Sequence, residues 1–375
     1  MSEDQAAGGA SGIDDFTTPW RRDAREVEAA LATWAAKTLP GTVTVSDVGA
    51  PGNGMSSETV LFSMRTGDGP AERFVARLAP QPEVYPVFQT YDLDLQARCM
   101  RLVRERTDAP APDVRWVESD TRWLGVPFLV MAGIDGEAPP DVPPYVFGGW
   151  LADASPDERA RLQRDAVSVL ARVHTITPAN ADLSFLRHPE HGPSALDQQL
   201  GHERAYYEWA REGITYPLVE RTFAWLDEHR PVEGESVLDW GDARIGNMLF
   251  RDFRVVGVLD WEMATVGPRE VDLAWMVFLH RFFQDLADRY GMPGIAGFMD
   301  RDDVASAYEA MTGHTPRDLD WFEVFAALRF AIVSIRTSTR GIAYGLAEQP
   351  DDPDDLVMFR ALLEEMLSRA PSTSR

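Results

Sequence analysis

Hydrophobic and polar residues alternate along several segments in the first third of the chain. Alternation of this kind places successive side chains on opposite faces of a strand. The predicted strands are 42–50, 58–66, 72–79, 113–118 and 126–131. Residues 22–38 and 92–106 instead carry apolar positions at helical spacing. The pattern therefore predicts an antiparallel sheet of five strands accompanied by two helices.

The second part of the chain has mainly helical periodicity. Apolar positions three and four residues apart predict a series of helices. These cover residues 162–173, 218–226, 270–285, 321–340 and 354–369, with a β-rich island at 236–260. Residues 133–149 are dense in glycine and proline, which is typical of a hinge or linker. The order of elements indicates an α+β protein with a β-rich N-terminal lobe and a mainly helical C-terminal lobe.

Charge and length exclude several classes of partner. The chain has 375 residues and a net charge of -24, which repels DNA phosphates and anionic lipid headgroups. No segment approaches the roughly 18 uncharged apolar residues of a membrane helix. We therefore expect neither nucleic acid nor membrane as a partner. The sequence does not indicate an oligomeric state.

Two scarce residue types limit the chemistry further. Cys99 is the only cysteine, so an intrachain disulfide and a cysteine-based zinc site are excluded, and a cytoplasmic location is expected. Lys37 is the only lysine, so no later position can supply a catalytic lysine. The acidic, small-residue segment 1–20 has no signal-peptide pattern and predicts a disordered, uncleaved tail.

The candidate chemistry lies in the β-rich island. Asp242 precedes Asn247 by five residues, and Asp260 follows at the end of the next apolar stretch. Phosphoryl transfer needs a carboxylate to accept the proton of the attacking hydroxyl and oxygen ligands for Mg²⁺. Asp242 suits the first role, and Asn247 and Asp260 suit the second. Glu262 shares a strand face with Asp260 and is a further metal candidate, and Arg244 can neutralise charge on the transferring group.

An Asp or Asn alone in a loop is more often a turn former or a helix cap. The combined spacing is what favours phosphoryl transfer. Residues 240–262 resemble the aminoglycoside phosphotransferase and choline kinase branch of the kinase-like fold. Its motif is H-G-D-x-x-x-x-N followed by D-x-[DE], and Trp240-Gly241-Asp242 through Asn247 and Asp260-Trp261-Glu262 match it.

The resemblance covers about residues 40–345 and is greatest to uncharacterised actinobacterial members and to kinase-like domains fused to some acyl-CoA dehydrogenases. It implies a bilobal protein-kinase-like fold, ATP and Mg²⁺ as cofactors, and a small-molecule hydroxyl as acceptor. Asp272 fits the family position that stabilises the catalytic loop. The expected division is a tail at 1–20, a nucleotide-binding lobe at 21–132, a hinge at 133–149 and a catalytic and acceptor lobe at 150–370.

A glycine-containing loop between the first two strands is the candidate phosphate-covering loop. Its backbone N–H groups and hydroxyls are suited to phosphate oxygens. The candidate residues are Gly52, Gly54, Ser56 and Ser57. A plain hairpin turn explains the same residues, because the third glycine of G-x-G-x-x-G is absent.

The nucleotide lobe departs from the family at two positions. Arg77 stands where the resemblance implies lysine, and Gln96 stands where it implies the partner glutamate. A guanidinium oriented by a neutral amide can bind phosphate oxygens in a bidentate manner. A catalytically inactive, nucleotide-binding pseudokinase is the competing interpretation. Met131 and Gly133 fall where adenine contacts are implied, although a buried strand entering a loop has the same pattern.

The acceptor is expected to be an apolar or anionic hydroxyl compound, such as a hydroxyacyl thioester, and not an aminoglycoside. Arg329, Arg336 and Arg340 share one helix face within an apolar stretch, where an unpaired charge favours an anionic partner. An aromatic stripe that includes Trp275 lies on another helix. The alternative interpretation is a core stripe beside solvated arginines.

Other reaction classes lack their motifs. The chain contains neither G-x-x-x-x-G-K-[ST] nor G-x-S-x-G. His188 and His191 form a close pair in a proline-bearing loop, where surface residues are commoner than metal ligands. His174 ends an apolar helix face and is expected to be a core or cap residue.

Overall fold

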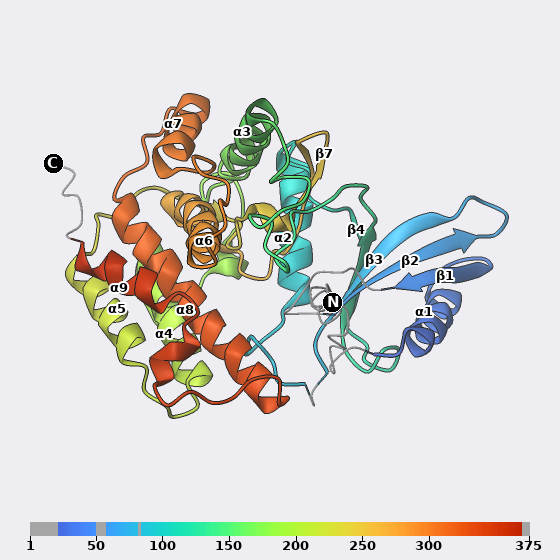
Figure 1. Ribbon diagram of the computed structural model, residues 1–375. Coiled ribbons are helices and arrows are strands. Elements are labelled where there is room, and N and C mark those ends of the chain that lie inside the picture. The colour runs from blue at the N-terminus through green and yellow to red at the C-terminus, as the bar shows by residue number, and fades with distance from the viewer. Residues whose placement is uncertain (1–21, 50–57, 82–83, 370–375) are drawn as a thin grey trace, which may run out of the picture.

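A computed structural model describes residues 22–49, 58–81 and 84–369. It consists of a β-rich lobe and a larger helical lobe, joined near α2, as Figure 1 shows. The predicted tail and the four loop residues Gly52, Gly54, Ser56 and Ser57 lie outside the described residues.

The N-terminal lobe is one antiparallel sheet with two helices. Its elements are α1 (Ala24–Thr38), β1 (Val43–Gly49), β2 (Glu58–Thr66), β3 (Glu72–Leu78), α2 (Leu93–Arg106), β4 (Val114–Glu118) and β5 (Phe128–Ala132). The strand order is β1-β2-β3-β5-β4, with every neighbouring pair antiparallel. The five strands and two helices predicted from periodicity are therefore confirmed.

Aromatic side chains hold α1 against the sheet. Trp34 of α1 is buried and makes edge contacts with Trp116 of β4 and Phe128 of β5, at ring-centroid distances of 5.7 and 5.3 Å. Phe62 and Phe74 stack across β2 and β3 at 5.8 Å. Edge and offset contacts of this kind are favourable for aromatic pairs. They join α1 to β4 and β5, and β2 to β3.

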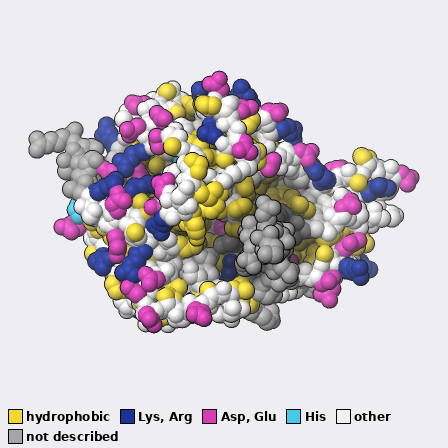
Figure 2. All heavy atoms as spheres, viewed as in Figure 1, with side chains coloured by type: hydrophobic (Ala, Val, Ile, Leu, Met, Phe, Trp, Pro, Cys, Tyr) yellow, Lys and Arg dark blue, Asp and Glu magenta, His cyan; other side chains and the backbone are white. Residues whose placement is uncertain are grey.

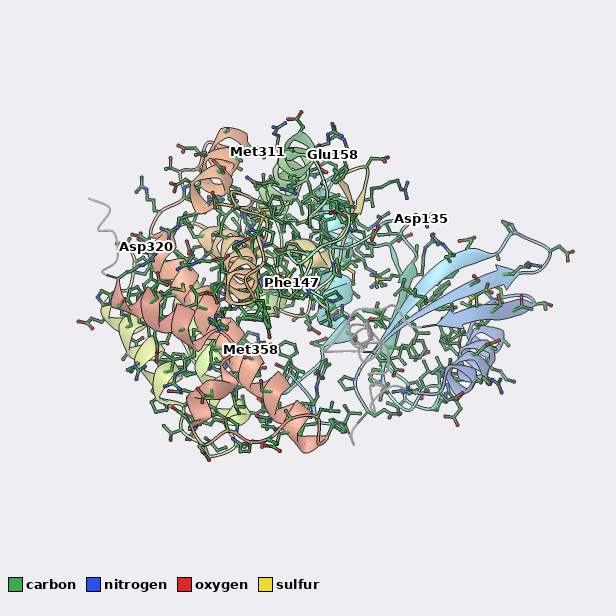
Figure 3. The ribbon with its side chains drawn as sticks, viewed as in Figure 1. Asp135, Phe147, Glu158, Met311, Asp320 and Met358 are labelled. Atoms are coloured by element: carbon green, nitrogen blue, oxygen red, sulfur yellow. The ribbon has the colours of Figure 1, made fainter. Side chains whose placement is uncertain are left out.

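The helical lobe packs around α8. Its helices are α3 (Pro156–Val173), α4 (Ala195–Ala210), α5 (Pro217–Glu228), α6 (Glu270–Arg289), α7 (Arg301–Thr312), α8 (Leu319–Ala343) and α9 (Arg360–Ser368), with short 3₁₀ turns η1 (Ser184–Leu186), η2 (Pro189–His191), η3 (Ile245–Asn247) and η4 (Pro353–Leu356). Helix α8 packs against α4, α5 and α6. Helix α3 begins with a reciprocal cap between Ser155 and Glu158, whose exposed position is labelled in Figure 3.

Two small two-stranded sheets accompany these helices. Strand β6 (Ser236–Asp239) pairs with β9 (Thr265–Pro268), and β7 (Met248–Arg251) pairs with β8 (Arg254–Val258). Glu137, in the glycine- and proline-rich segment, exchanges backbone hydrogen bonds with Phe250 of β7 at 2.9 and 2.8 Å. The segment after β5 therefore runs along the hairpin that precedes Asp260.

Several helical-lobe predictions were incomplete. Periodicity did not predict α4 or α7, and β9 was also absent from the predicted elements. Helix α4 buries polar Gln198, Gln199 and Glu203, which break its apolar pattern, and α7 buries only Val304 and Tyr308. The segment predicted as one helix at 354–369 consists of η4 and α9, which residues 357–359 separate, with Val357 in an extended conformation.

The described helices include none that is long and apolar enough to cross a membrane. Figure 2 shows basic and acidic side chains interspersed over the visible face of the helical lobe, with apolar side chains gathered toward the middle of the molecule. Mixed charge of this kind leaves no large basic surface on that face.

Candidate active site

The loop after β6 is held by a buried carboxylate on α6. Asp272 accepts hydrogen bonds from the backbone nitrogens of Trp240 and Gly241 at 2.7 and 2.8 Å. His174, at the end of α3, lies 3.1 Å from the same carboxylate through Nε2. Gly241 has φ +90°, and a Cβ there would lie 1.9 Å from the carbonyl oxygen of Met263. Only glycine fits this turn, and the supporting role expected for Asp272 agrees with its contacts.

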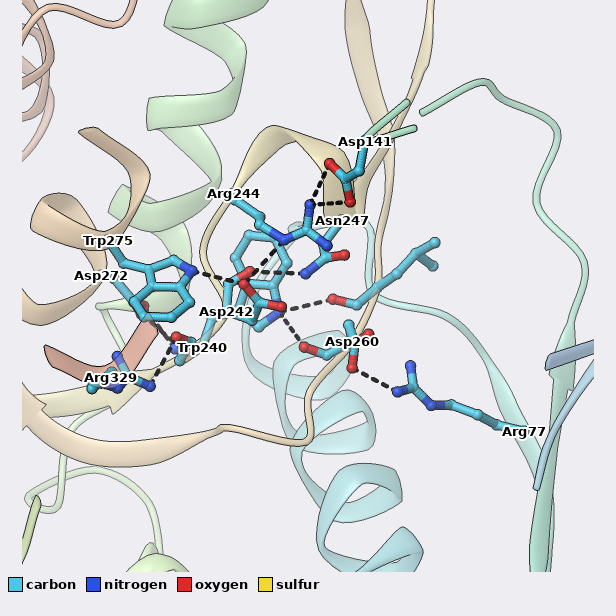
Figure 4. Close-up of polar contacts among 12 residues, drawn as sticks. Arg77, Asp141, Trp240, Asp242, Arg244, Asn247, Asp260, Asp272, Trp275 and Arg329 are labelled. Carbon is cyan, nitrogen blue, oxygen red and sulfur yellow. Dashed lines mark hydrogen bonds and ion pairs between the residues drawn. The ribbon is translucent and has the colours of Figure 1, made fainter. Parts of the chain in front are cut away.

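Asp242 follows directly and points toward α6 (Figure 4). Its Oδ1 accepts a hydrogen bond from Trp275 Nε1 at 2.7 Å and lies 3.2 Å from Arg244 Nε. Burial raises the pKa of the Asp242 carboxyl, the Arg244 charge lowers it, and the Asp260 charge raises it further. The carboxylate is thus fixed in orientation and is more basic than an exposed one.

Arg244 is held between two carboxylates. Its Nη1 contacts both oxygens of Asp141 at 2.8 and 2.7 Å, while Nε faces Asp242. These ion pairs raise the pKa of the guanidinium despite its burial. Asp141 belongs to the segment that runs along β7 and β8, and no sequence signal distinguished it. The charge of Arg244 therefore lies beside Asp242 and is shared with Asp141.

Asn247 ends the loop in the short turn η3. Its Nδ2 donates to the carbonyl oxygen of Asp242 at 3.2 Å, which leaves the amide oxygen as the group that Asn247 can offer to a metal. Its own carbonyl accepts from the backbone nitrogen of Leu259 at 2.8 Å. The five-residue spacing thus closes a loop that also contacts the residue before Asp260.

Asp260 lies two residues after the end of β8, in a left-handed conformation with φ +59°. This conformation is uncommon for a residue with a side chain and is found at functional sites. The indole Nε1 of Trp240 donates to the carbonyl oxygens of Leu259 and Asp260 at 2.9 and 3.1 Å. Trp240 therefore connects the Asp242 loop to the Asp260 turn.

Arg77 reaches this turn from β3 and is buried. Its Nη2 lies 2.7 Å from Asp260 Oδ1 and 3.1 Å from Glu262 Oε2. These charges raise the pKa of Arg77 against the opposing effect of burial. The structure thus places Arg77 against the two predicted metal carboxylates, a contact that the sequence did not indicate.

Gln96 of α2 does not orient Arg77 by a hydrogen bond, contrary to expectation. Among the described residues, both polar atoms of its buried amide lack a hydrogen-bond partner. The Nε atom of Arg77 is also buried without an acceptor. Buried polar groups are normally paired, so these atoms mark a place where bound polar groups would be stabilised.

Met131 and Gly133 lie at the end of β5. Because β5 lies between β3 and β4, the backbone of Met131 is flanked by paired strands. The backbone nitrogen of Gly133 donates to the carbonyl oxygen of Arg73 at 2.8 Å. The groups at these positions that are available to contact a nucleotide are the Met131 side chain and the Gly133 carbonyl.

The predicted arginine row does not contain unpaired charges. Arg329 is buried, donates to the Gly241 carbonyl at 3.1 Å, pairs with Glu203 at 3.4 Å, and lies over the Trp275 ring. Arg329 therefore supports the Asp242 loop, directly and through Trp275. The sequence indicated that Arg329 and Trp275 lie in the acceptor region, because Glu203, the partner of Arg329 on α4, was not predicted.

Arg336 is also paired within the chain. It lies 2.7 Å from Glu212 and stacks over the rings of Tyr85 and Trp209. Arg340 likewise has an interaction of its own. The argument that an unpaired charge in this row requires an anionic acceptor was therefore wrong.

A small hollow of about 10 Å³, which is space for about one water molecule, lies beside Arg244. Its lining is mostly apolar and contains no carboxylate among the described residues. The lining residues are Tyr145, Arg244, Ile245, Gly246, Met276, Leu279, His280, Phe283 and Met299. Tyr145 and His280 hydrogen-bond at 2.8 Å within it.

Together, the sheet, the helical lobe and the Asp242 loop define a kinase-type phosphotransferase. Residues 47–311 match the model of the phosphotransferase enzyme family, and the chain belongs to that family. Among solved structures, macrolide 2'-phosphotransferase MphH from Brachybacterium faecium has 19% identity and a TM-score of 0.54, covering 92% of this chain and 99% of that one. A thermostable mutant of aminoglycoside phosphotransferase APH(4)-Ia, solved with ADP and hygromycin B, has 14% identity, a TM-score of 0.57, and coverage of 91% and 100%. These likenesses support the fold.

Curated relatives include much longer proteins. Mouse acyl-CoA dehydrogenase family member 10 is 25% identical over 253 residues, which is 67% of this chain and 21% of that protein. Chicken acyl-CoA dehydrogenase family member 11 is 25% identical over 270 residues, covering 70% and 32%. The chain thus spans between a fifth and a third of the length of these relatives.

Proposed function

We propose that the protein transfers the γ-phosphoryl group of ATP to a hydroxyl group of a small molecule with the help of Mg²⁺. The observation that carries this proposal is the connected geometry of Asp242, Asn247 and Asp260. The first two lie on one closed loop, and Trp240 ties that loop to the turn of Asp260.

The residues present fit a magnesium–nucleotide complex. Mg²⁺ prefers oxygen ligands, and the Asn247 amide oxygen with the Asp260 and Glu262 carboxylates supplies them. Bound there, Mg²⁺ would neutralise phosphate charge. The unpartnered donors Arg77 Nε and Gln96 Nε2 are suited to phosphate oxygens beside it. The neighbour solved with ADP has the same fold and supports a nucleotide at this place.

Asp242 serves as the proton acceptor. The acceptor hydroxyl oxygen forms a bond to the γ-phosphorus, the bond between that phosphorus and the bridging oxygen breaks, and ADP leaves. The hydroxyl proton passes to the Asp242 carboxylate. Trp275 fixes that carboxylate, and Arg244 provides positive charge beside it.

We infer that the acceptor is an apolar or anionic hydroxyl compound, with a hydroxyacyl thioester as the leading candidate, and not an aminoglycoside. The hollow beside Arg244 is too small to hold such a compound as it stands, but its described lining is mostly apolar, contains no carboxylate and includes the positive charge of Arg244, which disfavours a polycationic acceptor. The names of the acyl-CoA dehydrogenase relatives support an acyl compound.

A pseudokinase is the second candidate, and one observation favours it. Arg77 contacts both Asp260 and Glu262, so the guanidinium already neutralises the carboxylates that would bind Mg²⁺. An active enzyme requires the nucleotide complex to replace part of this contact.

The test is a screen for Mg²⁺-dependent ADP release with hydroxyacyl-CoA thioesters, choline, simple sugars and kanamycin-type aminoglycosides, followed by mass spectrometry of the product. Asp242→Asn is the control for chemistry. Release of ADP with a phosphorylated thioester supports the full proposal. Efficient phosphorylation of an aminoglycoside contradicts the acceptor class, and nucleotide binding without any turnover supports the pseudokinase.

A further inference from the structure

Three histidine side chains meet outside the phosphoryl-transfer site. His188 precedes the turn η2, His191 is its last residue, and His202 lies on α4. Their ring centroids are separated by 5.9 Å for His188 and His191, 5.6 Å for His188 and His202, and 5.9 Å for His191 and His202. Three of the seven histidines of the chain therefore form a triangle.

The turn is seated firmly on α4. Gln198 accepts from the backbone nitrogen of His188 at 3.0 Å and donates to the Gly192 carbonyl at 3.1 Å, so it joins both ends of the turn to the helix. A Cβ at Gly201 would lie 2.5 Å from the His191 carbonyl oxygen, so glycine permits the close approach. The backbone of the turn that carries His188 and His191 is therefore fixed against the helix that carries His202.

Glu190 adds a carboxylate to the triangle. Its Oε1 lies 3.1 Å from His188 Nδ1 and 4.0 Å from His191 Nε2. One ligand atom from each of His188, Glu190 and His191 can be chosen so that all lie within 4.8 Å of one another. The side chains of His188 and His191 are 43% and 24% exposed, so an ion can enter from solvent.

We propose that His188, Glu190 and His191 bind a divalent transition-metal ion such as Zn²⁺, and that the neighbouring ring of His202 becomes a further ligand by side-chain rotation. Neutral imidazole suits Zn²⁺, whereas Mg²⁺ prefers oxygen ligands. Three imidazoles on one tetrahedral Zn²⁺, with Zn–N bonds of 2.0–2.1 Å, have ring centroids about 5.2 Å apart. The observed separations exceed this value by less than 1 Å, which side-chain rotation can close.

The ion would join the turn to α4 beside residues that support the active site. Glu203 follows His202 on α4 and pairs with Arg329, which donates to the Gly241 carbonyl. The site is separate from the carboxylates proposed for Mg²⁺ and does not depend on phosphotransferase activity.

The experiment is calorimetric titration of untagged protein with ZnCl₂ in buffer that contains millimolar Mg²⁺, which keeps hard-cation sites filled. The parent should bind one equivalent, and Zn²⁺ should raise its thermal midpoint. The double variant His188→Ala, His191→Ala should lose this binding, and Glu190→Gln should weaken it by about 10–100-fold.

His229→Ala is the matched control, because His229 lies at the end of α5 and bonds to its own helix. It should bind Zn²⁺ as the parent does. Thermal unfolding in EDTA establishes that each variant is folded before titration. Absence of stoichiometric Zn²⁺ binding by the parent, or equal affinity in the folded double variant, would overturn the proposal.

Discussion

Asp242 combines burial with neighbours of both charges. Burial and the charge of Asp260 raise the pKa of its carboxyl, while Arg244 and the Trp275 hydrogen bond favour the ionised form. A raised pKa means that ionisation is less favourable in the folded chain than in the unfolded chain. The free energy of unfolding therefore falls as the pH rises above the ordinary pKa of aspartate, about 3.9. The loss is complete once the pH exceeds the pKa of Asp242 in the folded chain.

Asp242→Asn should lower turnover by about 10²–10⁴, the usual effect of losing a general base. At pH 7 its thermal midpoint should equal or exceed that of the parent, because the substitution removes an unfavourable buried charge. Steady-state kinetics and calorimetry measure the two effects. Asp227→Asn, in an exposed pair with Arg204, is the control and should change neither. A parent-like rate in Asp242→Asn would remove Asp242 from the mechanism.

Arg77 is expected to contact nucleotide phosphates once they enter. Arg77→Ala should raise the ATP dissociation constant, because charge-assisted hydrogen bonds contribute about 1.5–3 kcal/mol. Arg77→Lys should restore only part of the affinity, since an ammonium group cannot reproduce the guanidinium geometry. Titration calorimetry with Mg-ATP checks both variants. If Arg77→Ala binds as the parent does, the pseudokinase alternative or another phosphate contact gains support.

At the scale of elements, periodicity predicted the strands better than the contacts between helices. Strands β2 and β3 match their predicted ranges closely, because one face of each is buried and the alternation is strong. The loop from Asp242 to Asn247 was predictable because its residues are close in sequence. The partners of Arg329 and Arg336 were not, because Glu203 and Glu212 come from other parts of the chain and sequence periodicity carries no information on such pairs.

The pairing of α4 with α8 gives a prediction at this scale. Arg329→Met leaves Glu203 buried without its partner, and breaking a buried ion pair in this way typically costs about 3–5 kcal/mol. The double variant Glu203→Gln, Arg329→Met should be less destabilised than the sum of the single variants. Urea denaturation measures the free energies of unfolding. Asp285→Asn, which removes an exposed pair with Arg289 on α6, should cost less than about 1 kcal/mol. Strict additivity of the two buried substitutions would contradict the coupling.

At the scale of the whole molecule, the two lobes share one continuous hydrophobic core. The same cluster of buried side chains includes Trp34 of α1 and Trp321 of α8. A net charge of -24 opposes this compact state through self-repulsion, although the two signs are mixed over the surface in Figure 2. A continuous core favours unfolding of both lobes in one transition.

Chemical labelling of Cys99 can measure the unfolding of the N-terminal lobe. Cys99 is fully buried in α2, and burial raises the pKa of its thiol to about 12, so almost no reactive thiolate is exposed at neutral pH. A disulfide reagent should leave the native protein unmodified and react with one equivalent after unfolding. In urea, labelling should follow the loss of helical circular dichroism. Labelling at clearly lower urea would show that the N-terminal lobe opens first.

The single lysine affects the labelling of this protein by nucleotide reagents that react with lysine. Lys37 is exposed on α1, while an arginine, Arg77, stands in the proposed nucleotide site. Reagents that carry a nucleotide to a kinase and then acylate the lysine of strand β3 would find a guanidinium in its place. Such profiling would overlook an active enzyme of this kind, and binding would have to be detected by a reagent that does not require lysine.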